Sequence, residues 1–469
     1  MGAIWPTHER RFKWKVDCTV LPLLTFGLLA AQIDKMNLAS ALTAGFASDI
    51  NVDQNTINLG NQLMYLGVVL LEIPSNLLLQ RIGPQRWISG QVLTFGFVAI
   101  CQVFITNRTG FLVSRAVLGL TESGYIPAAL FTLSTWYTKE QLAKRLAVFF
   151  FGMFGGNAIA PILASGILKL DGVRGLKGWQ WLFLIEGLFT LGIAVMMFLF
   201  LPKLPSTTTA KIGGAVESSS SATTSQEEIS WTSSESKSTA RGTDAEMKDF
   251  NFGVVWETIT QYRRWLHFVA SFCVFSTWSP LTTYTPSIIM SLGFDRITAN
   301  ALAAVGPFLA LLVIFAMAVF SDRTNKRGLA VILAVCLYLI VLVVARAVQP
   351  HAGKWSRWGL WTAVNALAVG YHPVHNTWLQ LNCEDPRERS ISVAMWVMAS
   401  QGGLMVGTQY FRGGDGPYYN NGLCIMIAMV AVGLVLMMAQ SIVYAAHNRR
   451  VAQHGNQDKG TEEVWLYNP

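Results

Sequence analysis

The stretch that decides the fold is Gly328–Val348, which reads GLAVILAVCLYLIVLVVARAV and holds one charged residue, Arg346. An α-helix rises about 1.5 Å per residue, so about 20 apolar residues cross the roughly 30 Å of hydrocarbon in a bilayer. Comparable apolar runs recur in residues 16–31, 182–201, 299–320 and 423–446. This repetition predicts an all-α membrane protein that crosses the bilayer many times.

Composition excludes several classes of protein. The chain is 52% hydrophobic and 13% charged, whereas a soluble domain carries about 25% charged residues. Its net charge is +8. Because the charged residues flank long apolar segments, we expect a lipid bilayer and no nucleic acid as its partner. The six cysteines stand singly, which predicts free thiols and no metal site. No nucleophile–base pair stands out, so we expect neither an enzyme nor a cofactor.

Twelve transmembrane helices are predicted, in two six-helix halves. They span residues 16–44, 57–80, 86–106, 110–135, 141–169, 179–201, 264–291, 297–320, 328–349, 357–381, 389–411 and 421–446. An excess of Lys and Arg on one side predicts that the N- and C-termini are both cytoplasmic. The domains are then an N-terminus (1–15), a six-helix bundle (16–201), a linker (202–263), a second six-helix bundle (264–446) and a tail (447–469).

The linker between the halves is predicted to be cytoplasmic and largely disordered. Residues 206–243 contain 19 Ser or Thr in 38 positions, and such a segment cannot bury enough apolar surface to offset the entropy lost on ordering. Residues 250–265 mix aromatic, aliphatic and charged side chains. That pattern fits either a helix lying in the membrane interface or a simple extension of the loop.

Four charged residues inside predicted helices are the first functional candidates, because a charge within a bilayer is costly unless it meets a cavity or a partner. Arg115 and Glu122 are seven residues apart, which places both on one helix face about 10.5 Å apart. Asp34 and Lys35 are neighbours, about 100° apart around a helix, so only one can point fully inward. Structural alternatives remain open: an interfacial anchor for Arg115, a static ion pair for Glu122, and a solvated helix end for the other two.

Short motifs surround these charges and continue into the second half. They are Asp34–Asn37 (DKMN), Glu72–Leu79 (EIPSNLLL), Arg115–Pro127 (RAVLGLTESGYIP), Trp136–Thr138 (WYT), Gly178–Phe183 (GWQWLF), Asn376–Trp378 (NTW) and Gln409–Tyr418 (QYFRGGDGPY). Together they resemble the anion:cation symporter branch of the major facilitator superfamily, and within it the fungal allantoate/nicotinate/pantothenate permeases. Residues 80–86 and 321–327 are similar to the superfamily's short cytoplasmic loop signature.

This resemblance implies a fold and a set of roles. The fold would be two pseudo-symmetric six-helix halves that rock about a central site, giving each side access in turn. Asp34 and Glu122 would carry the coupling proton, while Lys35 and Arg115 would hold a substrate carboxylate. The family usually has Arg where Lys35 stands, and Lys offers a point charge in place of a bidentate fork. Arg115 would therefore be the main clamp.

Polar and aromatic residues complete the predicted substrate site. They are Asn157, Trp278, Tyr284, His375, Asn376, Trp378 and Gln401. Duplication would place helices seven and ten opposite helices one and four, where such groups could contact the uncharged end of a substrate. Each also has a structural alternative: packing for the tryptophans, a satisfied hydroxyl for the tyrosine, interhelical hydrogen bonding for the amides, and a structural role for the histidine.

The predicted function is proton-coupled uptake of a small organic anion by alternating access. A carboxylate such as a vitamin, a ureide or another monocarboxylate fits the expected charges, and the proton is the coupling ion. We expect a monomer in the plasma membrane. The alternatives are an efflux antiporter or an uncoupled facilitator of the same fold, and a nutrient sensor that does not transport.

Overall fold

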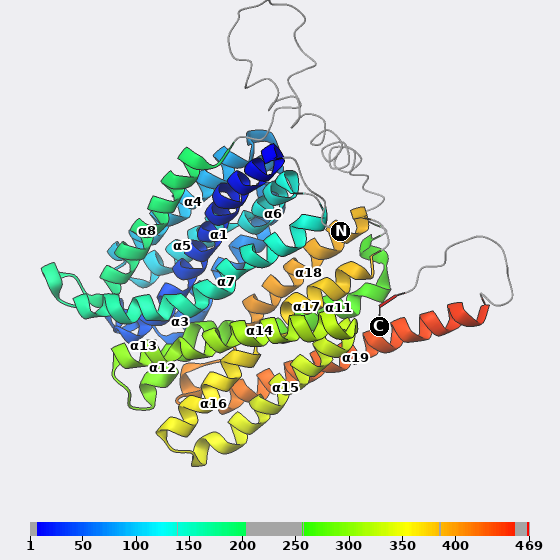
Figure 1. The fold of residues 1–469 in the computed structure, drawn as a ribbon. Coiled ribbons are helices and arrows are strands. Elements are labelled where there is room, and N and C mark those ends of the chain that lie inside the picture. Colours follow the sequence, from blue (N-terminus) through cyan, green and yellow to red (C-terminus); the bar gives the residue numbers. More distant parts are fainter. Residues whose placement is uncertain are drawn as a thin grey trace, which may run out of the picture.

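The structure is a computed structural model that describes residues 7–137, 139–202, 256, 258–383, 386–454 and 467–468. Figure 1 shows an N-terminal bundle, coloured blue to green, beside a C-terminal bundle, coloured green to red. Most of the predicted disordered linker at 202–263 lies outside the described residues, whereas the possible interfacial helix at 250–265 is described at 256 and 258–265.

The first bundle comprises α1 to α8, and one of its membrane-crossing segments is broken, between α5 and α6. Its helices are α1 (Thr7–Thr43), α2 (Phe46–Asp49), α3 (Gln54–Ile82), α4 (Pro84–Cys101), α5 (Arg108–Glu122), α6 (Tyr125–Trp136), α7 (Lys139–Ile167) and α8 (Gly178–Phe200), with short 3₁₀ turns η1 (Gln102–Phe104), η2 (Leu168–Leu170) and η3 (Val173–Gly175).

The second bundle repeats this arrangement. Its helices are η5 (Tyr262–Arg264), α11 (Trp265–Ser276), α12 (Trp278–Ser291), α13 (Arg296–Ala303), α14 (Val305–Thr324), α15 (Arg327–Val348), η6 (Gln349–His351), α16 (Lys354–Leu367), α17 (His372–Leu381), α18 (Pro386–Gly407), η7 (Gly413–Asp415) and α19 (Asn420–His454). Within the described residues, eight helical segments are long and apolar enough to cross a membrane. These helices are those of a multi-pass membrane protein.

Four of the predicted helices are each divided into two helical elements, although two of them, Arg108–Trp136 and Arg296–Thr324, still form single candidate membrane spans. The structure divides 110–135, 264–291, 297–320 and 357–381 into the pairs α5/α6, α11/α12, α13/α14 and α16/α17. Every second member has a proline in its first turn: Pro127, Pro280, Pro307 and Pro373. Proline lacks the N–H that would bond to the carbonyl four residues earlier. Each proline therefore removes one helical hydrogen bond at the junction between the two elements.

The break between α5 and α6 is the most pronounced and lies beside the candidate site. Gly124 adopts φ +80°, and a Cβ there would collide with Ser75, so a residue with a side chain would be strained. The carbonyl of Ser123, which Pro127 leaves without a helical donor, accepts a hydrogen bond from Gln91 Nε2 at 2.6 Å. The Ser123 hydroxyl donates to the Val68 carbonyl at 2.9 Å. These contacts fix the direction of the Glu122 end of α5.

Equivalent helix pairs in the two halves make equivalent close contacts. In the first half, Gly152 and Gly156 of α7 lie against backbone of α1; in the second, Gly403 and Gly407 of α18 lie against backbone of α11. Small residues four apart allow such backbones to approach within a membrane. Ion pairs occur at similar places too, with Asp17–Arg145 at 2.7 Å across α1/α7 and Arg264–Glu388 between η5, directly before α11, and α18. The halves are therefore pseudo-symmetric.

These glycines give a stability prediction. A Cβ on Gly407 would overlap the carbonyl oxygen of Ser276, which cannot move aside, so Gly407→Ala should destabilise the protein by about 1–3 kcal/mol through overpacking. Gly192→Ala is the matched control, because that helical glycine has no heavy atom within 4 Å of the added Cβ. Thermal unfolding in detergent should show a lower midpoint for the first variant and an unchanged or higher one for the second. Equal midpoints would contradict this packing.

The two halves are joined at the end of the bundles that carries the end of α1 and the start of α3, here called the distal end. Asn300 Nδ2 donates to Thr43 Oγ1 at 2.8 Å, and Asn58 Nδ2 donates to the Phe411 carbonyl at 2.9 Å. Tyr284 Oη also donates to Asn58 Oδ1. These bonds run between α1, α3, α12, α13 and the end of α18. They close the distal end.

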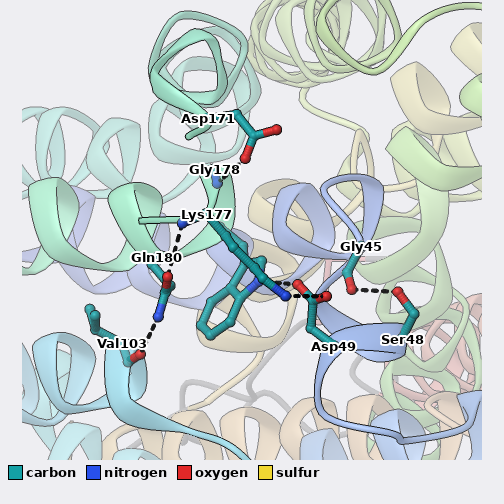
Figure 2. A network of polar contacts seen from close by, with 9 residues as sticks. Gly45, Ser48, Asp49, Val103, Asp171, Lys177, Gly178 and Gln180 are labelled. Carbon is teal, nitrogen blue, oxygen red and sulfur yellow. Dashed lines mark hydrogen bonds and ion pairs between the residues drawn. The ribbon is translucent and has the colours of Figure 1, made fainter. Parts of the chain in front are cut away.

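A polar network stiffens the first half at this end (Figure 2). Asp49 pairs with Lys177 Nζ at 2.5 Å and accepts from Trp179 Nε1 at 2.7 Å. Asp171 accepts from the backbone N–H of Gly178 at 2.7 Å, and its other oxygen forms an ion pair with Arg296 of the second half at 2.7 Å. The network thus extends across the boundary between the halves.

The Asp171–Arg296 pair should favour the closed distal end in a pH-dependent way. The hydrogen bond from Arg296 lowers the pKa of Asp171, so the pair is intact above the ordinary carboxyl range and is lost as pH falls through the lowered pKa. Both side chains are about one-third exposed, which limits the contribution to at most about 1 kcal/mol. Asp171→Asn should therefore increase the equilibrium constant for opening of the distal end only several-fold.

Spin labels on the 171–173 loop and the start of α13 would report that opening as a longer distance. The exchanged pair Asp171→Arg with Arg296→Asp should restore the short distance. Failure of the exchange to restore it would show that the charges do not act as a pair.

Candidate functional site

Two small cavities lie between the halves and share Met36, Trp278 and Thr282 in their walls. One, of about 20 Å³, is polar and is lined further by Gln32, Lys35, Leu38, Ala39, Asn61, Met64, Tyr65, Arg115 and Thr283. The other, of about 30 Å³, is mostly apolar and includes Phe154, Asn157, Pro161, Leu281 and Asn365. Volumes of this size hold one or a few waters. The halves must move apart for a larger molecule to enter.

Arg115 is the cation at the centre of the polar cavity. Its side chain comes from the middle of α5 and is 1% exposed. Nη2 donates to Asn61 Oδ1 at 2.6 Å, and Asn61 Nδ2 donates onward to Thr283 Oγ1 of the second half at 3.1 Å. Among the described residues, Nε and Nη1 of Arg115 have no hydrogen-bond partner. A buried guanidinium with two free donors is suited to bind a carboxylate.

Lys35 and Glu122 form an ion pair across α1 and α5. Lys35 Nζ lies 2.8 Å from Glu122 Oε2, with the lysine side chain 22% exposed and the glutamate side chain 2% exposed. Lys35 lines the polar cavity, whereas Glu122 lines neither cavity. Arg115 and Glu122 are thus both buried on α5 without pairing with each other. Glu122 is linked to the polar cavity by its ion pair with Lys35, which lines that cavity.

Asp34 points away from the cavity that its neighbour lines. It is fully buried, and its Oδ2 accepts from Thr190 Oγ1 of α8 at 3.1 Å. This is the division expected for adjacent residues about 100° apart around a helix. Asp34 and Lys35 therefore lie in two different environments: the lysine faces the space between the halves, and the aspartate faces the interior of the first half.

Two of the remaining predicted residues line the cavities. Asn157 of α7 lines the apolar cavity and accepts a hydrogen bond from Gln32 Nε2 at 2.9 Å. Trp278 lines both cavities, with its ring centroid 6.3 Å from that of Phe154 in the other half. These aromatic rings form an apolar wall next to the buried arginine.

The other five predicted residues lie outside both cavities. Tyr284 contacts Asn58 at the distal end. His375 is buried in a ring cluster, 3.0 Å from His267, and Trp378 donates to the Asn468 carbonyl at 2.7 Å. Asn376 accepts from Gln380 at 3.2 Å, and Gln401 is half-buried. The structure does not bring these five together with Arg115.

Several site residues were missed by the sequence reasoning. Asn61, Thr282 and Thr283 carry no charge, and only the packing of α3 against α5 and α12 shows their place. Glu186 of α8 is different, because it is a charged side chain within the apolar run 182–201 and is 2% exposed. The criterion that selected Arg115, a charged residue within an apolar helix, would also have selected Glu186. No group of three potential metal ligands occurs among the residues described.

Comparison with known proteins gives a consistent result. The family model described as Major Facilitator Superfamily matches residues 24–408. A high-affinity nicotinic acid transporter of Saccharomyces cerevisiae is 27% identical over 453 residues, 95% of this chain and 80% of that protein. The MFS-type transporter cnsO of Penicillium expansum is 27% identical over 428 residues, 90% and 80% of the two chains. A solved D-xylose-proton symporter superposes with a TM-score of 0.66 at 11% identity, covering 89% of this chain and 96% of that one.

Proposed function

Because this chain belongs to the Major Facilitator Superfamily and is a transporter of that fold, we propose that it takes up a small organic anion together with a proton. The observation that carries the proposal is Arg115, buried at the boundary between the halves with two donors that have no partner among the residues the structure describes. A buried cation left without an anion is strongly unfavourable. A substrate carboxylate would accept from one of these nitrogens and from the second N–H of Nη2, which present parallel N–H groups, and would remove that penalty.

The two cavities suggest the shape of the substrate. Its carboxylate would lie in the polar cavity beside Arg115 and Lys35, and its uncharged end would enter the cavity walled by Phe154, Trp278 and Leu281. A planar ring bearing a carboxylate fits both walls, because flat aromatic faces stack well against such rings. The relative that is a nicotinic acid transporter supports this substrate class.

Coupling to a proton follows from the competition for Lys35. While Glu122 is ionised, it holds Lys35 at 2.8 Å; once protonated, it releases the ammonium group to the incoming carboxylate. One proton on Glu122 and one anion on Lys35 then enter together, and no unpaired charge is created. Rocking of the halves would expose the loaded site to the other side of the membrane.

The orientation completes the proposal. With both termini cytoplasmic, the closed distal end faces outside, and entry from the outside requires the contacts at that end to separate. An inward proton gradient across the plasma membrane would drive uptake. Efflux by the same fold would require the reverse flux in oriented vesicles.

The test is uptake into proteoliposomes that contain the purified protein. Labelled nicotinate should accumulate against its gradient when the outside is acidic, and nicotinamide, which lacks the carboxylate, should not. Collapse of the pH gradient with a protonophore should stop accumulation but leave exchange. If the amide is transported as well as the acid, anion recognition by Arg115 is wrong; if accumulation persists without the gradient, proton coupling is wrong.

A further inference from the structure

Glu186 is a buried carboxyl group that does not line either cavity of the proposed transport site. It lies on α8, is 2% exposed, and neither carboxyl oxygen has a hydrogen-bond partner among the described residues. The described ion pairs include none at Glu186. Ionisation of a carboxyl group in such a place is strongly unfavourable, so the protonated form is favoured.

Asp34 is the acidic group that faces it. Thr190 lies one turn after Glu186 on α8, and its hydroxyl donates to Asp34 Oδ2 at 3.1 Å or to the Glu186 carbonyl at 3.1 Å. Asp34 is fully buried, its Oδ1 is also unpartnered, and its charge acts on Glu186. Two buried carboxyls thus lie on helices that pack together, and the Thr190 hydroxyl of α8 reaches the carboxyl of Asp34.

On the elements packed against α8, the cations whose side chains the structure describes are paired elsewhere or exposed. Lys35 of α1 pairs with Glu122, and Arg145 of α7 pairs with Asp17. Arg86 at the start of α4 and Lys169 of η2 are exposed. Glu122 is the further acidic group whose charge acts on Asp34. Two adjacent carboxylates without a cation cannot both ionise at modest free-energy cost.

We propose that Asp34 and Glu186 form a carboxyl pair that holds and releases a transported proton, separate from the Lys35–Glu122 pair. This inference rests on the proposed proton-coupled function and adds Glu186 to it. The only chemical step is the transfer of H⁺ between a carboxyl oxygen of the pair and water that enters when the halves rock. Thr190 is a positioning residue, because its hydroxyl can stabilise whichever form of Asp34 is present.

The position of the pair explains how it would couple to the substrate. Asp34 and Lys35 are consecutive on α1, so any rotation or bend of α1 that moves the lysine toward a substrate also moves the aspartate relative to Glu186. Loss of the proton would leave a charge that only a change of helix packing could solvate. The pair therefore links protonation within the first half to movement of the helix that contacts the substrate.

The test is a comparison of accumulation and exchange in proteoliposomes. Glu186→Gln keeps the size of the side chain but removes the exchangeable proton, so accumulation driven by a pH gradient should fall at least about tenfold while labelled substrate still exchanges. Thr190→Val, which keeps the volume, should shift the pH midpoint of accumulation by about half a unit or more. Infrared difference spectra should contain a protonated-carboxyl component that responds to pH, persists in Glu122→Gln and is missing in Glu186→Gln.

The outcomes separate the two hypotheses. If the wild type accumulates nicotinate and Glu186→Gln does so equally, with the same pH profile, the carboxyl pair is wrong and the proposed function stands. If the wild type itself shows no accumulation, the proton-coupled function is wrong. Should Glu186→Gln fail to fold, an unchanged pH profile in Thr190→Val, together with the absence of a pH-responsive carboxyl band in Glu122→Gln, overturns the pair.

Discussion

Replacing Arg115 with alanine should abolish saturable uptake of carboxylates, with a loss of affinity of at least about a hundredfold. The guanidinium is 1% exposed and lines the polar cavity, and two of its nitrogens, Nε and Nη1, have no hydrogen-bond partner within the described part of the chain. Hydrogen bonds to charged groups contribute about 1.5–3 kcal/mol each, and tenfold in affinity corresponds to about 1.4 kcal/mol. Two such bonds to a substrate carboxylate therefore account for the expected loss.

Two further variants refine this prediction. Arg115→Lys keeps the charge but replaces the planar fork with a single ammonium group, so about a tenfold loss is expected. Arg346→Ala is the matched control, since Arg346 is also an arginine in a membrane helix but is exposed and donates to Cys424 Sγ at 2.8 Å. Binding of labelled nicotinate to purified protein measures all three. Unchanged affinity in Arg115→Ala would remove the anion clamp from the proposal.

The fold was largely predictable because the bilayer imposes one length on every crossing helix. The apolar runs predicted twelve helices in two halves, and the resemblance to the major facilitator superfamily is confirmed. The interruptions were not predicted, although Pro127, Pro280, Pro307 and Pro373 marked them. Membrane helices tolerate proline when neighbours satisfy the freed carbonyl, as Gln91 does for Ser123, so the proline alone does not decide whether a helix continues.

The site was predictable only where charge made it visible. Arg115 was found because a cation inside an apolar helix is rare, and the structure places it in a cavity wall. The Lys35–Glu122 pair was not predicted, because helix spacing within α1 or α5 says nothing about how closely the two helices approach. His375 and Trp378 were selected by type and lie in the packing between α11, α17 and α19. Their rotation about the helix axis is fixed by tertiary packing, which one sequence does not reveal.

Replacing Glu122 with glutamine should give the second large effect, the loss of pH-dependent anion binding. In the wild type, an ionised Glu122 competes with the substrate for Lys35, so affinity for the anion should fall as pH rises. Glutamine cannot hold the ammonium group as an anion does, and Lys35 stays free at every pH. Affinity should then be independent of pH, and uphill accumulation should be lost while exchange continues.

The Lys35→Gln variant separates this competition from a static ion pair. Removing only the lysine leaves Glu122, 2% exposed, as a buried acid without a cation, which should destabilise the protein by about 3–5 kcal/mol unless the acid is protonated. The double variant Lys35→Gln/Glu122→Gln contains no buried charge from the pair and should recover most of that stability. A double-mutant cycle of unfolding midpoints in detergent would show a coupling energy of about 2 kcal/mol or more. Because a static pair would give the same coupling energy, the binding measurement decides: pH-dependent affinity retained in Glu122→Gln would mean that Glu122 only holds the helices together and that the proton is carried elsewhere.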